Sequence, residues 1–266
     1  MKKFLFALIA TLLIASCGQK QGQTARIDGV ELDSVVVDTV INLTEEANSP
    51  QCKVSLSLQY FRKGKNAQKM NVSLLHAGIL MPDYLSLGKE SIPFEHAVDS
   101  FITRYVSDYK REYAPLYRED HEHRAAYNCT YEVKTKTQNS NDDIVNYVAT
   151  IVTYGGGEHA IKQTIAKNFN VKTGQLLALG DVFVSGYEES LKEMMLKKLQ
   201  DKFEVGNLKE LQKKYIFADH EVYIPENFIL GKDKLTFIYC EDEIAPHNVG
   251  EIRVEFDKSD LNKFLK

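Results

Sequence analysis

The chain has 266 residues, of which 44% are hydrophobic and 26% are charged, and its formal net charge is -4. This composition excludes a disordered chain and allows one large domain or two small ones. The sequence does not indicate a basic face, so we expect no nucleic acid among the partners of the protein. A mildly acidic surface suits a cationic partner, but many soluble proteins have one without any role in recognition.

The first seventeen residues have the pattern of a bacterial lipoprotein signal. Two lysines follow the first methionine, residues 4–15 are an apolar stretch, and small residues precede Cys17. The stretch is about a dozen residues, whereas crossing a bilayer takes roughly 20. We predict a signal peptide at 1–16, lipid attachment at Cys17 and a flexible tether at 17–29; a buried N-terminal helix is the alternative.

The lipid signal predicts where the protein works. We expect it to reside in the cell envelope, held to a membrane by lipid after secretion rather than by a spanning helix. In a cell with two membranes, we expect the outer membrane and its periplasmic face. Which membrane and face apply is left open by the sequence.

Three cysteines remain after acylation of Cys17, and these are Cys52, Cys129 and Cys240. One disulfide with one free thiol, or three buried thiols, both fit this odd number, and the spacing does not select a pairing. The intervals are too wide for a zinc knuckle or a redox pair. We therefore predict no metal site among the cysteines, and no cofactor.

The first half of the mature chain predicts strands followed by a helix. Residues 35–43 have strand composition, and apolar and polar side chains alternate over 54–59. A helix is expected after Ser91, which can cap it, with Pro93 in the first turn and apolar side chains recurring at intervals of three and four. Pro115 ends this helical pattern.

From residue 124 onward, similar side chains recur at every second residue, as is typical of strands. Strands are expected at 131–137, 144–154 and 161–171, with a polar turn at 138–143. A second helix is predicted from Asp181 to Phe203, with a break allowed near Gly186. A short helix and three further strands follow, and these centre on 222–230, 235–240 and 251–256.

The order of these elements favours an α+β fold. Strands and helices do not alternate strictly, so we predict antiparallel sheets, each packed by a helix, in two sequential subdomains. The N-terminal domain is placed at 30–135 and the C-terminal domain at 140–266.

Two segments resemble a known domain family. The first runs from Tyr154 through Gly-Gly-Glu-His at 156–159 to Phe183, and the second from Phe237 through Pro-His-Asn at 246–248 to Gly250. They are similar to the extracellular domain of RsiV-type anti-sigma factors. The same domain occurs as an accessory domain in PdaC-type peptidoglycan deacetylases and in many lone bacterial lipoproteins of unknown function.

The resemblance is clearest over 145–266, and 30–135 resembles the companion domain that often precedes it. It implies a non-catalytic domain, which in RsiV-type members binds lysozyme through a surface that includes the late proline loop. This chain departs from the family pattern at Glu158, where alanine is usual, and at His247, where an aromatic residue, often tyrosine, is usual. The second departure bears directly on lysozyme recognition.

Several residues are candidates for a site, each with a structural alternative. The glycines at 155–157 lack the lysine of a phosphate loop, so we expect a hairpin or bulge rather than an anion cradle. His159 either bonds this turn or contacts a ligand. The loop 244–250 is either a recognition tip or folded over the core. His121 and His123 could share a strand face and hold a metal with a third ligand, or lie in a solvated loop.

We therefore predict a non-catalytic, lipid-anchored binding module that recognises a peptidoglycan-related ligand or a wall-degrading protein such as lysozyme. The candidate partner-binding residues are Gly156, Gly157, His159, Pro246, His247 and Asn248. The sequence has no nucleophile elbow, zinc-protease helix or dinucleotide fingerprint. Two alternatives stay open: a cell-wall hydrolase or deacetylase that uses His159, and a structural envelope lipoprotein without a diffusible ligand.

Overall fold

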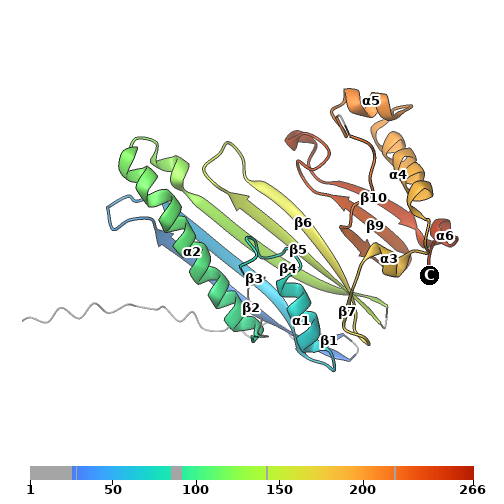
Figure 1. Cartoon of the computed structure of the whole chain (residues 1–266), viewed down its shortest axis with the longest axis horizontal. Coiled ribbons are helices and arrows are strands. Elements are labelled where there is room, and N and C mark those ends of the chain that lie inside the picture. Colours follow the sequence, from blue (N-terminus) through green and yellow to red (C-terminus); the bar gives the residue numbers. More distant parts are fainter. Residues whose placement is uncertain (1–25, 28, 85–91, 142, 219) are drawn as a thin grey trace, which may run out of the picture.

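The computed structural model describes residues 26–266 except 28, 85–91, 142 and 219 (Figure 1). Within this part the chain forms a seven-stranded sheet and a three-stranded sheet, each packed by helices. The buried apolar side chains form two clusters, one for each sheet. The predicted α+β fold with two sequential units is thereby confirmed. The expected signal peptide, Cys17 and the expected helix cap Ser91 lie outside the described residues.

The strands of the first sheet are arranged in chain order. They are β1 (Arg26–Ile27), β2 (Val30–Asn42), β3 (Gln51–Lys63), β4 (Cys129–Asn141), β5 (Ile144–Tyr154), β6 (Ile161–Asn170) and β7 (Gln175–Leu177). All neighbours pair antiparallel except β3 and β4, which are parallel. A parallel pair needs a long crossover, which here contains the helices α1 (Ala67–Leu75) and α2 (Phe94–Glu119).

Alternation along the strands decides which face of the first sheet is covered. Val54, Leu56 and Leu58 on β3 are buried and belong to one cluster with Val98 and Phe101 of α2. Figure 1 shows α1 and α2 lying along this face. Because successive side chains of a strand point to opposite faces, the intervening residues of β3 and β4 lie on the other face.

Helix α2 continues past Pro115, where the sequence pattern ended. It runs to Glu119, so the expected boundary was wrong by one turn. Proline costs one backbone hydrogen bond within a helix. The last turn persists because Tyr117 is buried there and its hydroxyl donates to Glu46 at 3.3 Å.

Three other elements of the first unit differ from expectation. Strand β4 extends to Asn141, through most of the expected polar turn at 138–143, because it pairs along this length with β5. Helix α1 was not predicted, since its nine residues are flanked by other apolar segments without a clear period. Arg26–Ile27, in the expected tether, pair with Val30–Glu31 as β1.

The second unit follows β7 directly. Its elements are α3 (Leu179–Val182), α4 (Glu188–Phe203), α5 (Leu208–Lys213), β8 (Phe228–Leu230), β9 (Lys234–Tyr239), β10 (Ile252–Asp257) and α6 (Lys258–Leu261). The sheet has the order β10-β9-β8 and is antiparallel. Gly186 adopts a φ of +85° between α3 and α4, which accounts for the break in the helical pattern. Strand β8 is much shorter than the expected strand at 222–230.

Buried amides connect the two sheets. Asn146 on β5 and Asn168 on β6 are each 1% exposed. The Asn146 amide donates to the Leu230 carbonyl at 3.1 Å, and the Asn168 amide donates to the Phe228 carbonyl at 2.9 Å. In return, Asn168 Oδ1 accepts the Leu230 N–H at 3.0 Å. These side chains satisfy backbone groups of β8 that would otherwise be buried without partners.

A third amide makes the connection from the opposite direction. Asn227, just before β8, accepts the Ala166 N–H at 2.8 Å and donates to the Thr164 carbonyl at 2.7 Å, both on β6. The position of the second sheet on the first is therefore fixed by directional hydrogen bonds as well as by apolar contact.

The buried clusters divide near residue 178. The first ends with Phe169, and the second begins with Leu179, apart from Ile144 on β5. The expected domain boundary between 135 and 140 falls within the β4–β5 hairpin of the first sheet. No helix in the described part of the chain is long and apolar enough to cross a membrane.

Candidate recognition site

The glycines between β5 and β6 form a tight turn that packs against the rest of the first unit. Gly156 has a φ of +80°, and a Cβ at this position would lie 1.9 Å from the carbonyl oxygen of Ala126. Ala126 belongs to η1 (Arg124–Tyr127), a short 3-10 helix after α2. Only glycine fits both the backbone angle and this close approach. A Cβ at Gly157 would meet open space.

The loop between β9 and β10 is half core and half surface. Ile244 is buried, and its carbonyl accepts the Phe217 N–H at 2.7 Å. Pro246 then begins η2 (His247–Val249), a short 3-10 helix, and Pro246 and Asn248 are exposed. The loop is therefore folded over the core at Ile244 and exposed at Pro246 and Asn248, and its role in recognition stays a prediction.

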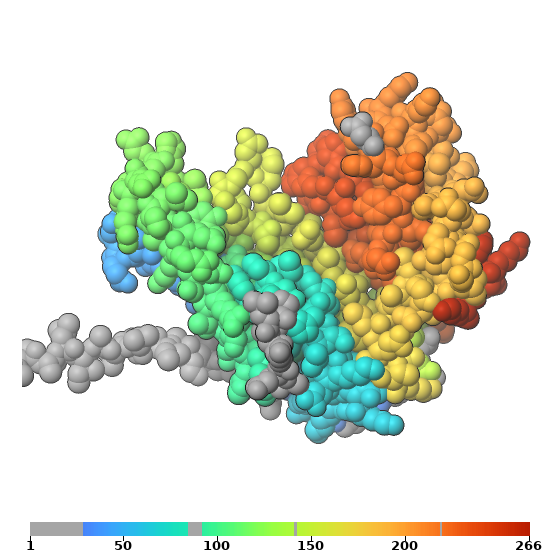
Figure 2. Space-filling view, in the orientation of Figure 1, coloured from blue at the N-terminus to red at the C-terminus, as the bar shows by residue number. Residues whose placement is uncertain are grey.

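These two loops meet. The rings of His159 and His247 stack with centroids 4.8 Å apart and planes at 14°. Nearby, Glu241 accepts the Lys162 N–H at 2.9 Å, which ties the second loop to the start of β6. The loops lie side by side along the upper edge of the molecule in the view of Figure 2. Residues that are far apart in sequence thus form one surface.

Carboxylates surround the stacked rings. His247 Nδ1 lies 3.1 Å from a carboxylate oxygen of Asp242 and 3.1 Å from one of Glu241. Chiefly through the hydrogen bond to Asp242, these groups raise the pKa of His247 above its ordinary value. Glu158 lies 3.8 Å from His159 on the other loop. We call Glu158, His159, Glu241, Asp242 and His247 the acidic tip.

The acidic tip is suited to recognition by its exposure. The side chain of His159 is 63% exposed and that of Glu158 is 94% exposed. Only Glu241, at 15%, is largely covered. Such a surface presents charge and two aromatic ring faces to a partner, in water rather than in a dry pocket.

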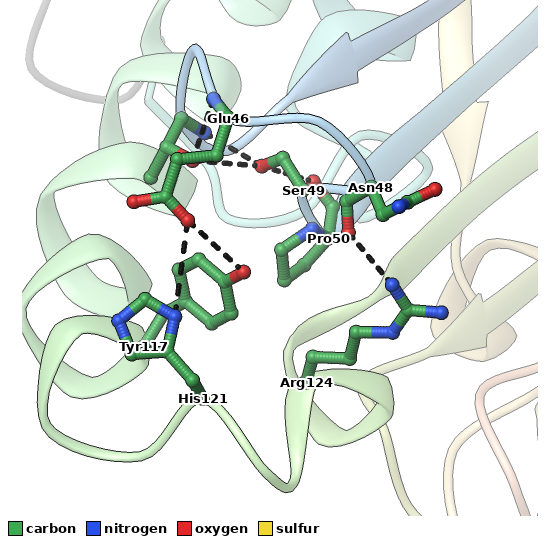
Figure 3. Close-up of polar contacts among 8 residues, drawn as sticks. Glu46, Asn48, Ser49, Pro50, Tyr117, His121 and Arg124 are labelled. Carbon is green, nitrogen blue, oxygen red and sulfur yellow. Dashed lines mark hydrogen bonds and ion pairs between the residues drawn. The ribbon is translucent and has the colours of Figure 1, made fainter.

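His121 and His123 do not converge on one point. They lie in a turn after α2, where a strand would have been needed to place them on one face. The His121 ring packs on Tyr117 and lies 3.8 Å from Glu46 (Figure 3), whereas His123 lies 2.8 Å from Asp120. Among the described residues no group of three histidine, cysteine or acidic side chains is arranged to hold a metal.

The three described cysteines are buried free thiols. Cys52 and Cys129 are register partners on the parallel strands β3 and β4, and a hydrogen bond between their thiols lowers the pKa of Cys52 and raises that of Cys129. The Cys240 thiol donates to the Thr164 carbonyl at 3.4 Å.

The sequence missed part of the acidic tip. Both histidine loops contain predicted candidate residues, but Glu241 and Asp242 are not among them. Glu241 contacts His247 and the backbone of β6, 79 residues away in sequence. No local pattern encodes such a contact, because it depends on how the second sheet sits on the first.

Comparison with known proteins places this fold in context. Residues 180–259 match the family described as "Protein of unknown function (DUF3298)". The crystal structure of a DUF3298 family member from Bacteroides fragilis has a TM-score of 0.78 at 22% identity and covers 91% of this chain and 96% of its own. A DUF3298 family protein from Pseudomonas aeruginosa has a TM-score of 0.59 at 14% identity, covering 88% and 94%. No curated protein matches the sequence significantly.

The chain thus has a DUF3298 match within its second unit and the fold of solved DUF3298 family structures. The matched residues include the late loop with His247, and the glycine turn lies before them. At these identities the likeness to the solved structures concerns the fold alone.

Proposed function

We propose that this protein is a non-catalytic binding module of the cell envelope, anchored by lipid at Cys17. Its ligand is a peptidoglycan-related molecule or a wall-degrading protein such as lysozyme. The observation that carries the proposal is the stacking of His159 on His247, because it joins two loops into one exposed surface. The resemblance of these two loops to the RsiV-type domain supports the same assignment.

The charge of the acidic tip favours the protein partner over the glycan. Carboxylates of Glu158, Glu241 and Asp242 surround the two rings, and lysozyme is a basic protein. Complementary charge speeds association and orients the partner. At His247 an imidazole stands where the family usually has an aromatic residue, and its stacking on His159 supplies a flat, oriented ring.

The enzymatic alternative finds little support at His159. A general base gains from a positioned partner and a shielded setting. His159 is instead mostly exposed, and its nearest carboxylate, Glu158, is 3.8 Å away and almost fully exposed. A structural lipoprotein without a diffusible ligand becomes the preferred alternative if no partner binds.

The test is a calorimetric titration of the full chain, kept in a neutral detergent, with lysozyme and with a muropeptide. We expect saturable binding of lysozyme, weakened at least tenfold by Glu241→Gln combined with Asp242→Asn. Both changes keep the side-chain shape, and asparagine tolerates the φ of +63° at position 242. The matched control, Asp38→Asn with Glu122→Gln, removes the same charge from exposed sites elsewhere.

The outcomes separate the alternatives. Equal weakening by the control would mean that lysozyme senses net charge only, which contradicts recognition by the acidic tip. Binding of the muropeptide alone would move the assignment to the glycan ligand. If neither binds, the recognition function is wrong.

The lipid anchor has its own test. Cys17→Ala removes the sulfur that would be acylated, so we expect the variant to accumulate as an unlipidated precursor, which its mass would show. A variant that is still acylated would contradict the anchor.

A further inference from the structure

A groove with the opposite charge lies where the two sheets meet. It has a volume of about 420 Å³. Its floor lies on the face of the first sheet opposite α2, where Ser57, Lys134 and Thr150 are in register across β3, β4 and β5. Its wall is formed by Ile229 of β8 and Arg253 of β10. The two units therefore create it together.

Positive charge dominates this groove. Lys134, Lys136 and Arg253 line it, and none of its lining residues is acidic. Arg253 is paired with Glu251 at 2.6 Å, but no carboxylate in the described part of the chain lies within ion-pair distance of Lys134 or Lys136. The neighbouring Lys53, by contrast, pairs with Glu132 at 3.5 Å. Lys134 and Lys136 repel each other, and an anion between them would relieve this repulsion.

The spacing of the two lysines sets the geometry of a ligand. They are two residues apart on one strand, so their Cα atoms are roughly 7 Å apart and both side chains leave the same face. The hydroxyls of Ser57 and Thr150 offer hydrogen bonds between strands, and Ile229 offers an apolar contact. Pockets of several hundred Å³ accommodate small ligands and their few orienting polar contacts.

Basic residues continue beyond Arg253. A second hollow of about 400 Å³ shares this arginine and is lined by Lys198 and Lys202 of α4. Its one acidic residue, Glu255, is already paired with Lys234 at 3.1 Å. A ligand longer than the first groove therefore meets further cations at this end.

We propose that this groove, which we call the basic groove, is a binding site for a small ligand with two or more carboxylate or phosphate groups. The ligand is about the size of a disaccharide or a tripeptide. This site is distinct from the acidic tip in residues and in charge, and it goes beyond the proposed function, since it does not require a protein partner. Buried amides that fix the second sheet on the first keep its wall in place without a ligand.

The test uses the full chain in a neutral detergent, titrated calorimetrically with sodium tripolyphosphate and, separately, with tricarballylate, a tricarboxylate. We expect one saturable site that weakens as salt is added, because the contacts are partly exposed charges. Lys134→Gln combined with Lys136→Gln should weaken binding at least tenfold. Lys209→Gln with Lys213→Gln on α5, which removes the same charge outside the groove, should leave binding within twofold.

Each result has a definite meaning. Preference for tripolyphosphate identifies a phosphate-bearing ligand, and preference for tricarballylate identifies a carboxylate-bearing one. Equal weakening by both double variants, or no saturable binding of either probe, overturns the proposal. Arg253→Gln provides a second variant, from the wall of the groove, and the proposal also requires it to lose affinity.

Discussion

The acidic tip and the basic groove are both composed of residues from the two units, but they differ in charge and in the structure that holds their side chains in place. The tip consists of two loops joined by the His159–His247 stack, and most of its side chains are exposed. The floor of the groove consists of three paired strands. The comparison teaches that a formal net charge of -4 describes neither region, since recognition depends on local fields.

Because the two regions are held in place differently, substitutions in them should affect binding and stability differently. Apart from Glu241, the side chains of the tip can be changed without disturbing a core, so their replacement should affect binding more than stability. The wall of the groove depends on buried amides, so its shape and the stability of the protein should change together. Substitutions in the exposed loops and at the buried amides therefore distinguish the two regions.

The largest effect is expected at the amide connection. Asn168→Ala leaves the Phe228 carbonyl, the Leu230 N–H and the Asn146 amide without this partner. Leaving buried polar groups unpaired costs about 1–3 kcal/mol each, so we expect a loss of about 3 kcal/mol or more in the free energy of unfolding. Denaturant unfolding measures this loss. Binding of tripolyphosphate should weaken in the same variant.

Gln163→Ala is the matched control on the same strand. Gln163 is exposed on β6, and we expect a change within about 0.5 kcal/mol. A comparable loss in both variants would mean that β6 is sensitive to any substitution, and that the amides have no special role.

The next effect concerns the glycine turn. Gly156→Ala would place a Cβ on the Ala126 carbonyl and force an unfavourable φ, so we expect about 2 kcal/mol of destabilisation and weaker lysozyme binding. Gly157→Ala, where the same Cβ meets open space, should be close to neutral. Thermal unfolding of the two variants compares them directly. Equal stability would show that the turn is not anchored on η1.

The smallest effect is a pH dependence of the tip. The pKa of His247 is raised above its ordinary value. Its contact with Asp242 therefore stabilises the folded state fully below about pH 6.5, and this stabilisation is lost as the pH rises through the raised pKa. An NMR titration of the imidazole should give a value above the ordinary one. Asp242→Asn should lower it, and Glu122→Gln should not. An unchanged titration in Asp242→Asn would contradict the assigned contact.

Much of the fold could be predicted because its signals are local. The alternation of Val54, Leu56 and Leu58 identified the covered face of β3, and the glycine at 186 indicated a break between helices. What failed was decided by tertiary contacts. Burial of Tyr117 carries α2 past Pro115, and pairing with β5 carries β4 through polar residues.

The candidate sites likewise combine residues that the sequence indicates with contacts that only the tertiary structure creates. Composition and resemblance drew attention to His159 and His247, but their contact arises only when the second sheet packs on the first. Lys134 and Lys136 lie within the predicted strand at 131–137, and that pattern does not mark them as a site. Periodicity and net charge do not predict their position beside Arg253, which is more than a hundred residues away in the sequence.

The most direct test of the whole account is a crossed titration of the two double variants with both ligands. We predict that Glu241→Gln with Asp242→Asn loses affinity for lysozyme and keeps that for tripolyphosphate. Lys134→Gln with Lys136→Gln should do the reverse. If either variant weakens both ligands equally, or if neither weakens its own, the acidic tip and the basic groove are not two separate recognition sites.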